Sequence, residues 1–297
     1  MKFDDYLKEQ VDLVRGQYYP VRAGLLRRLL VRRTRIRNLH PNPEDEFCHP
    51  DVGPNYRIIS HYEEEFRRQA GISRGSSSLS EYEDGGSAGE PLMVEKSRPD
   101  GYLILNGHHR WAAAFRMGLP KMDIKIVNLT QEKDIRDMLA RSQSDKRATL
   151  DLDEVVFRSG DDPLTEKPLP FFLRRLYPER VRLGIPALLN FLEHEGYDIW
   201  VYTSRYYSVE HIRSLFRLWN VRLTGIVTGT ARKSSRWSRS RAEMKKLLEN
   251  KYSVTLHIDN DLIVRSHSGS KEMEEAPLNA SSATWAGDAV DAIKKLS

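Results

Sequence analysis

The chain contains 297 residues, of which 39% are hydrophobic and 30% are charged, and its formal net charge is +5. This balance supports a packed core rather than a disordered chain, and the length suggests about two domains. Every apolar stretch is shorter than the roughly 18–20 residues that cross a bilayer. Cys48 is the only cysteine, which excludes an internal disulfide and a cysteine-cluster metal site. We therefore expect a cytoplasmic protein with no membrane partner.

The hydrophobic pattern of residues 1–140 predicts a small α+β domain. Segment 73–90 is rich in Ser, Gly and acidic residues, so we expect a mobile loop there. Thr130 is expected to cap the last helix of this domain. The expected helices are 3–17, 23–31, 109–117 and 130–143, and the expected strands are 35–39, 91–96, 101–107 and 123–129.

Residues 141–297 alternate between apolar strands and amphipathic helices. This order predicts a Rossmann-like parallel sheet with helices on both faces, within an α/β fold. The expected strands are 148–157, 197–204 and 253–261, and the expected helices are 185–194, 208–219, 233–249 and 287–295.

Polar residues follow the three predicted strands of this second domain. Asp151 and Asp153 end the first strand, Thr203 ends the second, and Asp259 and Asp261 end the third. Ligands of open α/β sheets bind beyond the carboxyl ends of the strands. Crowded carboxylates are unfavourable unless a cation neutralises them, and Mg²⁺ suits one or two carboxylates together with water and phosphate oxygens. We therefore expect a Mg²⁺ site at this edge.

Three segments of the second domain resemble motifs of the haloacid dehalogenase (HAD) superfamily. The segments are ATLDLDEVVF (148–157), IWVYTS (199–204) and LHIDND (256–261). The resemblance implies a Rossmann-like fold, a Mg²⁺ cofactor and phosphoryl transfer to water through an aspartyl-phosphate. The segment between the first two motifs leaves no room for a large cap domain, so the resemblance implies an open cleft suited to a bulky or macromolecular phosphate. The substrate would be a phosphorylated small molecule or a nucleic-acid end.

The resemblance also implies a role for each matched residue. Asp151 would be the nucleophile, and Asp153 would be the general acid and then the general base. Thr203 would hold the oxygens of the transferred phosphoryl group. Mg²⁺ would be bound by Asp151, by the backbone carbonyl of Asp153 and by Asp259, with Asp261 assisting.

The HAD pattern also requires a lysine that balances the charge of the phosphate. Two residues precede the third strand at plausible distances. Lys233 lies in the expected loop GTARKSS, and Lys245 lies further along the following helix. Lys233 is the preferred candidate, and Lys245 is the alternative.

The turn NGHHR between a strand and an Ala-rich helix is a second chemical cluster. Gly107 lets the backbone approach a ligand, the N–H groups at the helix start favour an anion, and Arg110 can bind a phosphate bidentately. The segment 103–127 resembles the ParB/sulfiredoxin-like superfamily, in which this turn binds nucleotide phosphates. Gly107, His108, His109 and Arg110 would then contact ATP or another nucleotide. His108 stands where sulfiredoxins carry a reactive cysteine, so sulfiredoxin activity is not expected.

Three functions follow from these patterns. The first is a Mg²⁺-dependent HAD-type phosphatase, a hydrolase with an N-terminal nucleotide- or phosphate-binding module. The second is a nucleotide-dependent small-molecule kinase or nucleotidase with an accessory HAD-like domain. The third is a non-enzymatic nucleic-acid or regulatory binder that uses the basic runs 22–37 and 232–246. Trp237 would either stack on a base or pack in the core.

Overall fold

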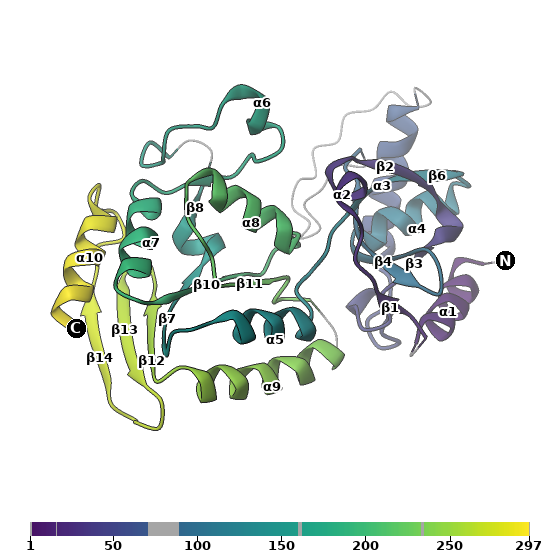
Figure 1. Cartoon of the computed structure of the whole chain (residues 1–297). Coiled ribbons are helices and arrows are strands. Elements are labelled where there is room, and N and C mark those ends of the chain that lie inside the picture. Colours follow the sequence, from purple (N-terminus) through teal and green to yellow (C-terminus); the bar gives the residue numbers. More distant parts are fainter. Residues whose placement is uncertain (1, 16, 71–88, 160–161, 233–234, 297) are drawn as a thin grey trace. The chain divides into compact units, whose positions relative to one another are not determined.

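The computed structural model describes residues 2–15, 17–70, 89–159, 162–232 and 235–296. The chain divides into two compact units, Met1–Asn128 and Leu129–Arg232 with Arg236–Ser297 (Figure 1). This division lies earlier than the expected boundary at residue 140. Helix α5 (Glu132–Arg141) belongs to the second unit because its buried Ile135 and Met138 join the hydrophobic core of that unit. No helix among the described residues is long and apolar enough to cross a membrane.

The first unit is built on a mixed sheet with strand order β2-β6-β4-β5-β3, and β1 pairs with β4. Pairing is parallel between β4 and β6 and antiparallel between β4 and β5. Trp111 and Ala112–Ala114 of α4 are fully buried in the core. The elements are α1 (Phe3–Val14), β1 (Tyr19–Pro20), α2 (Leu25–Leu29), β2 (Arg32–Arg35), η1 (Ile36–Asn38), β3 (Leu39–His40), η2 (Glu46–Cys48), α3 (Tyr56–Gln69), β4 (Leu92–Arg98), β5 (Tyr102–Asn106), α4 (His108–Arg116) and β6 (Lys121–Ile126). The expected loop 73–90 lies almost entirely outside the described residues.

The second unit contains a sheet with strand order β11-β10-β7-β12-β13-β14. The first four strands are parallel, and β13 and β14 are antiparallel additions. Helices α5 and α9 cover one face, and α7 and α8 cover the other (Figure 1). The elements after α5 are β7 (Lys146–Asp151), the π-helical turn η3 (Leu152–Val156), β8 (Phe157–Arg158), α6 (Phe171–Arg174), β9 (Arg180–Val181), α7 (Ile185–His194), β10 (Asp198–Thr203), α8 (Val209–Leu218), β11 (Gly225–Thr228), α9 (Ser235–Lys251), β12 (Val254–Ile258), β13 (Leu262–His267), β14 (Met273–Pro277) and α10 (Trp285–Leu296).

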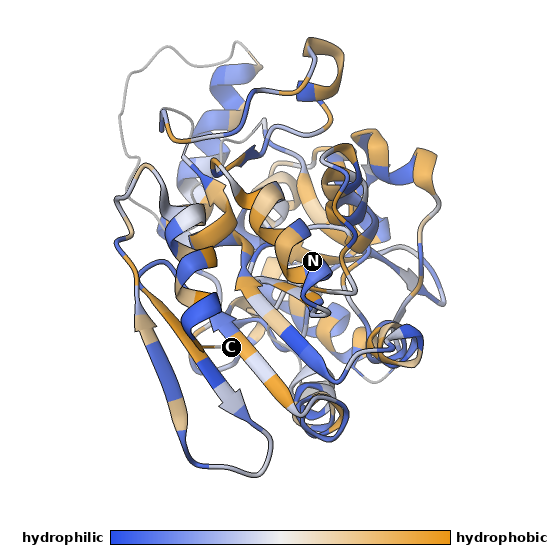
Figure 2. Ribbon diagram, turned by 60° about the vertical axis from the view of Figure 1, so that its left-hand side comes forward, coloured by the Kyte–Doolittle hydropathy of each residue, from blue (hydrophilic) through white to orange (hydrophobic). Residues whose placement is uncertain are grey.

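The burial of the strands follows their position in this sheet. All residues of β11 and β10, and all but one of β12, are buried or half-buried, as expected for parallel strands covered on both faces. The outer strand β14 is mostly exposed, and it carries hydrophilic as well as hydrophobic residues (Figure 2). The mixed α/β class and the parallel core of the second unit are therefore confirmed. The segment between β8 and β9 carries only the short helix α6, and β8 pairs with β9 in a small hairpin.

Candidate functional site

The carboxyl ends of β10, β7 and β12 lie side by side because these parallel strands are neighbours in the sheet. Asp151 at the end of β7 pairs with Tyr202, and Ile258 at the end of β12 pairs with the residue before Asp151. Thr203 and Asp259 are the next residues on the two flanking strands. The polar residues that follow three separate strands in the sequence thus meet at one edge.

Asp151 caps the turn that leads away from β7. Its Oδ1 accepts hydrogen bonds from the backbone N–H groups of Asp153 at 2.7 Å and Glu154 at 3.1 Å. Both bonds use the same oxygen, so Oδ2 is the oxygen that can act on a ligand. Burial raises the pKa of the Asp151 carboxyl, and the carboxylates of Asp153 and Asp259 raise it further, against the lowering effect of the two N–H donors. The shift indicates that the three carboxylates share one electrostatic environment.

Four donors converge on the carboxylate of Asp153. They are Thr203 Oγ1 at 2.9 and 3.0 Å, Ser204 N and Ser204 Oγ at 2.9 Å each, and Arg205 Nε at 3.2 Å. Thr203 is fully buried, whereas Arg205 is 62% exposed. We call Thr203, Ser204 and Arg205 the anion cradle. The sequence singled out Thr203, but it did not point to Arg205, whose only sequence signal is its place two residues after the end of β10.

A buried arginine holds the turn that carries Asp259 against η3. Arg182 donates from Nη1 to Asn260 Oδ1 at 2.9 Å and from Nη2 to the carbonyl of Ala280 at 2.7 Å. Its guanidinium lies 3.8 Å from the centre of the Trp285 ring. Asn260 Nδ2 donates to the carbonyl of Glu154 at 2.8 Å. Asn260 therefore links the turn after β12 to η3, and no sequence motif pointed to this link.

Two carboxylates and one backbone carbonyl are available for a metal ion. Among the described residues, no three His, Cys, Asp or Glu side chains lie close enough to hold a metal together. The Asp153 carboxylate is engaged by the anion cradle, and Asp261 is exposed. Asp151 and Asp259 fit Mg²⁺, which takes one or two carboxylates and retains water molecules. The carbonyl of Asp153 can serve as a third protein ligand.

The two candidate lysines differ in what the structure describes. Lys233 lies outside the described residues. Lys245 lies in the middle of α9, is 78% exposed and pairs with Glu249 at 3.8 Å. Arg205 is a described cation that contacts the site directly, through its ion pair with Asp153.

The NGHHR turn of the first unit is folded into the protein. Gly107 adopts φ of +96°, and a Cβ at this position would lie 2.5 Å from Leu92. His108 and Arg110 are buried, and His109 Nε2 accepts from the backbone of the loop before α3. Arg110 donates to the backbone carbonyl of Glu90 at 3.1 Å. The turn therefore ties loops of this unit together in the structure, and nucleotide binding at Gly107, His108, His109 and Arg110 stays a prediction.

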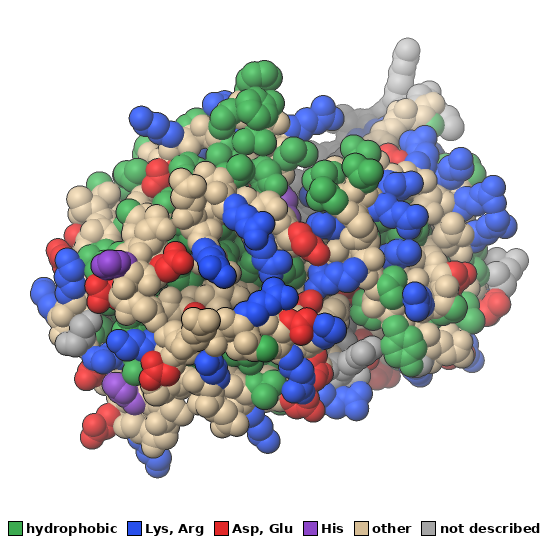
Figure 3. Space-filling view, in the orientation of Figure 1, with side chains coloured by type: hydrophobic (Ala, Val, Ile, Leu, Met, Phe, Trp, Pro, Cys, Tyr) green, Lys and Arg blue, Asp and Glu red, His purple; other side chains and the backbone are tan. Residues whose placement is uncertain are grey.

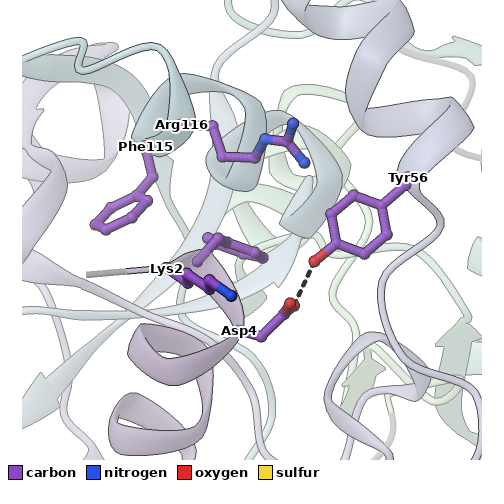
Figure 4. Close-up of a pocket in the computed structure, with 6 residues that line it drawn as sticks. Lys2, Asp4, Tyr56, Phe115 and Arg116 are labelled. Atoms are coloured by element: carbon purple, nitrogen blue, oxygen red, sulfur yellow. Dashed lines mark hydrogen bonds between the residues drawn. The ribbon is translucent and has the colours of Figure 1, made fainter.

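The first unit has a hollow of about 470 Å³ at the other end of α4 (Figure 4). Tyr56 donates a hydrogen bond to Asp4, and the Arg116 guanidinium lies 5.2 Å from the centre of the Tyr56 ring. The lining residues are Lys2, Phe3, Asp4, Tyr56, Phe115 and Arg116. The hollow is therefore separate from the NGHHR turn.

Trp237 is not available for stacking on a base. Its side chain is 5% exposed and belongs to the core of the second unit. The guanidinium of Arg232 lies 3.7 Å from the centre of its ring. Of the two roles open to Trp237, base stacking and core packing, the structure shows core packing, and base stacking by this residue is excluded.

Two comparisons with known proteins bear on the chain. Residues 85–143 match the family of the ParB N-terminal domain, which confirms the expected similarity to ParB-like proteins over this segment. The matched residues include β4, β5, α4, β6 and α5 and end before β7. The chain is also 42% identical over 45 residues to an uncharacterized protein of Methanocaldococcus jannaschii. That match spans 15% of this chain and 17% of the relative's length.

Proposed function

We propose that the second unit is a Mg²⁺-dependent phosphoric monoester hydrolase of the HAD type that acts through an aspartyl-phosphate. The observation that carries the proposal is the anion cradle beside Asp151. Four hydrogen-bond donors on one strand end and the loop after it surround the two oxygens of a carboxylate. Charge-assisted hydrogen bonds of this kind also bind phosphate oxygens.

The Asp153 carboxylate stands where an anionic group of a substrate would be held. A phosphoryl group in the cradle would accept the bonds from Thr203 and Ser204 that Asp153 accepts here. Asp153 would then be released to exchange protons with the substrate. One side chain can therefore fill the anion site before binding and serve as acid and base afterwards.

The reaction proceeds in two displacements at phosphorus. Oδ2 of Asp151 attacks the phosphorus atom, the P–O bond to the leaving group breaks, and Asp153 donates a proton to the departing oxygen. A water molecule then attacks the phosphorus atom of the acyl phosphate while Asp153 accepts a proton from it. The P–O bond to Asp151 breaks, which restores its carboxylate and releases inorganic phosphate.

The remaining residues of the site position the reacting groups and neutralise their charge. Asp151, Asp259 and the carbonyl of Asp153 would hold Mg²⁺, which would offset the repulsion between the nucleophile and the phosphate. Asp261 assists from the same turn. Lys233, with Lys245 as the alternative, adds positive charge, and Arg205 supplies a cation at the mouth of the site.

The test is phosphate release from an aryl phosphate, with and without Mg²⁺, by the wild type and by Asp151→Asn. The variant should lose activity by on the order of 10³-fold or more, because an amide is not a competent nucleophile. Its Oδ1 can still accept the two backbone bonds, so circular dichroism should be unchanged. Removing a carboxylate whose pKa is raised by burial should not lower the thermal midpoint at neutral pH without metal.

Asp291→Asn is the matched control, since Asp291 is exposed on α10. It should retain wild-type activity. Near-wild-type turnover by Asp151→Asn, or a wild-type rate that is the same with Mg²⁺ and with a chelator, would contradict the assigned chemistry.

A second proposal is nucleotide binding by the first unit, as in a nucleotide-dependent kinase or nucleotidase. The match to the ParB N-terminal domain over residues 85–143 favours it. Calorimetric titration of ATP, CTP and ADP against the full chain and against Arg110→Ala tests it. Binding by the wild type that is lost in a folded Arg110→Ala variant would support the proposal. If no nucleotide gives a heat of binding with the wild type, the proposal is wrong.

A further inference from the structure

Two phenylalanines on α6 are exposed to solvent next to one another. Phe171 is 83% exposed and Phe172 is 62% exposed. Their ring centres lie 5.7 Å apart and their planes are perpendicular. Figure 3 shows hydrophobic side chains gathered at the top of this unit, where α6 lies. Adjacent exposed aromatic rings are uncommon on a surface that binds nothing.

The residues on either side hold these rings in place. Leu169 and Tyr177 pack against the core of the second unit. The backbone N–H of Leu173 donates to Pro170 O at 2.8 Å, and Arg174 Nε donates to Leu169 O at 2.7 Å. The segment 167–177 is therefore anchored at both ends while its two rings point to solvent. We call this segment the α6 platform.

The α6 platform is continuous with the anion cradle. Its Tyr177 ring lies 4.9 Å from the ring of His211, which stacks on Tyr207 at 5.7 Å and 7°. Tyr207 shares a hydrogen bond with Arg205, and Arg205 pairs with Asp153. The Glu179 carboxylate also contacts this row, because its Oε1 lies 2.9 Å from His211 Nε2. A row of mostly aromatic side chains thus runs from the platform to the candidate phosphate site.

The charge of the platform has one sign. Between residues 167 and 177 the chain carries Lys167, Arg174 and Arg175 and no acidic residue. All three cationic side chains are exposed. Exposed aromatic rings among cations are the arrangement that binds single-stranded nucleic acid, because bases stack on the rings and phosphates pair with the cations.

We propose that the substrate is a single-stranded nucleic acid that carries a terminal phosphate. Its bases stack on Phe171 and Phe172, its backbone phosphates pair with the cations of the α6 platform, and its terminal phosphate enters the anion cradle. This inference rests on the proposed phosphatase function and names its substrate class. A lipid surface is the competing partner, but the aromatic row that leads into the site favours a ligand with several stacking groups.

The test uses the full chain and a fluorescent single-stranded oligonucleotide with a phosphate at its unlabelled end, in one version 5′ and in another 3′. Fluorescence anisotropy gives the affinity of the wild type and of Phe171→Ala/Phe172→Ala. The double variant should bind about 5- to 140-fold more weakly, which corresponds to the roughly 1–3 kcal/mol of one stacked base. Met273→Ala is the matched control, because Met273 is 62% exposed on β14, and it should bind like the wild type.

Hydrolysis assays separate this inference from the proposed function. The double variant should release phosphate from an aryl phosphate at the wild-type rate and lose kcat/KM only with the oligonucleotide. If the wild type hydrolyses the aryl phosphate but the double substitution leaves oligonucleotide affinity unchanged, the substrate class is wrong and the phosphatase stands. If the wild type hydrolyses neither compound while the substitution weakens binding, the phosphatase fails and the platform stands as a binding surface.

Two further measurements use the same variant. Sedimentation with vesicles that contain phosphatidylserine tests a lipid surface, and gel filtration tests a second copy of the chain. If the double substitution abolishes vesicle binding or changes the oligomeric state and leaves oligonucleotide affinity intact, the proposed partner is overturned.

Discussion

Asn260→Ala should destabilise the second unit, although the side chain is only half-buried. Asn260 Oδ1 accepts from Arg182 Nη1 at 2.9 Å, and Asn260 Nδ2 donates to Glu154 O at 2.8 Å. Arg182 is 1% exposed, so water cannot readily replace the lost acceptor. Burial, followed by the nearby Arg158 guanidinium, lowers the pKa of Arg182 to about 10, because removal from water disfavours the charged form of the guanidinium.

The expected loss of stability follows from the two hydrogen bonds that the Asn260 side chain makes. A hydrogen bond to a charged group contributes about 1.5–3 kcal/mol, and a neutral bond contributes about 0.5–1.5 kcal/mol. The free energy of unfolding should therefore fall by about 2–4.5 kcal/mol. For a unit of this size that corresponds to a thermal midpoint lowered by about 4–18 °C. The Trp285 bond to the Asn260 carbonyl survives in the variant, because it uses the backbone.

Urea denaturation of the full chain measures the effect, with Asn250→Ala on the exposed face of α9 as the control. The control should stay within about 0.5 kcal/mol of the wild type. A double-mutant cycle with Arg182→Met should show coupling, because the Met variant has already lost the charged partner. An Asn260→Ala variant as stable as its control, or a cycle that is strictly additive, would refute the assigned role of Asn260. Weaker phosphate release by Asn260→Ala is expected as well, since the turn carrying Asp259 loses its tie to η3.

Two further predictions concern packing and pH. Gly225→Ala should lower the free energy of unfolding by about 1–3 kcal/mol, because the new Cβ would lie 2.0 Å from the buried Trp200 ring. Gly287→Ala is the control and should not lower it, because a Cβ there meets no atom within 4 Å. Chemical denaturation that finds the two variants equally stable would contradict this prediction. Burial lowers the pKa of His40 below its ordinary 6.5, and the Asp100 carboxylate only partly opposes this. The folded protein therefore takes up this proton at lower pH than the unfolded chain, so stability is lost as the pH falls below about 6.5. His40→Gln should lose less stability than the wild type between pH 7 and pH 5 in denaturation at both pH values, and equal losses would count against burial as the cause.

The local sequence pattern was sufficient to predict several helices and strands of the second unit. The helix expected at 185–194 is α7, with the same ends, because its apolar residues recur at helical spacing and Gly196 follows it. The segment 197–204 contains β10, whose apolar run reflects burial on both faces. Such features depend on residues close in sequence, so they can be read without the fold.

Elements whose partners are distant in sequence were missed or misassigned. β11 has only four residues and begins with a glycine, and it is a strand because it pairs with β10. Thr130 was expected to cap α5, but it is buried and donates to Ile226 O at 2.9 Å. The N-cap is instead Gln131, whose backbone N–H donates to Asp134 Oδ2 at 2.7 Å, and the helix begins at Glu132.

The candidate site likewise contains some residues that the sequence predicted and others that only the tertiary structure revealed. The acids and hydroxyls at Asp151, Thr203 and Asp259 were predicted from the sequence, because a residue that directly follows a parallel strand must lie at the carboxyl edge of the sheet. The tertiary structure alone decided that Arg205 faces Asp153 and that Arg110 is enclosed by its own unit. A long side chain can reach in several directions from one backbone position, and only the packing of distant segments selects the group that it contacts.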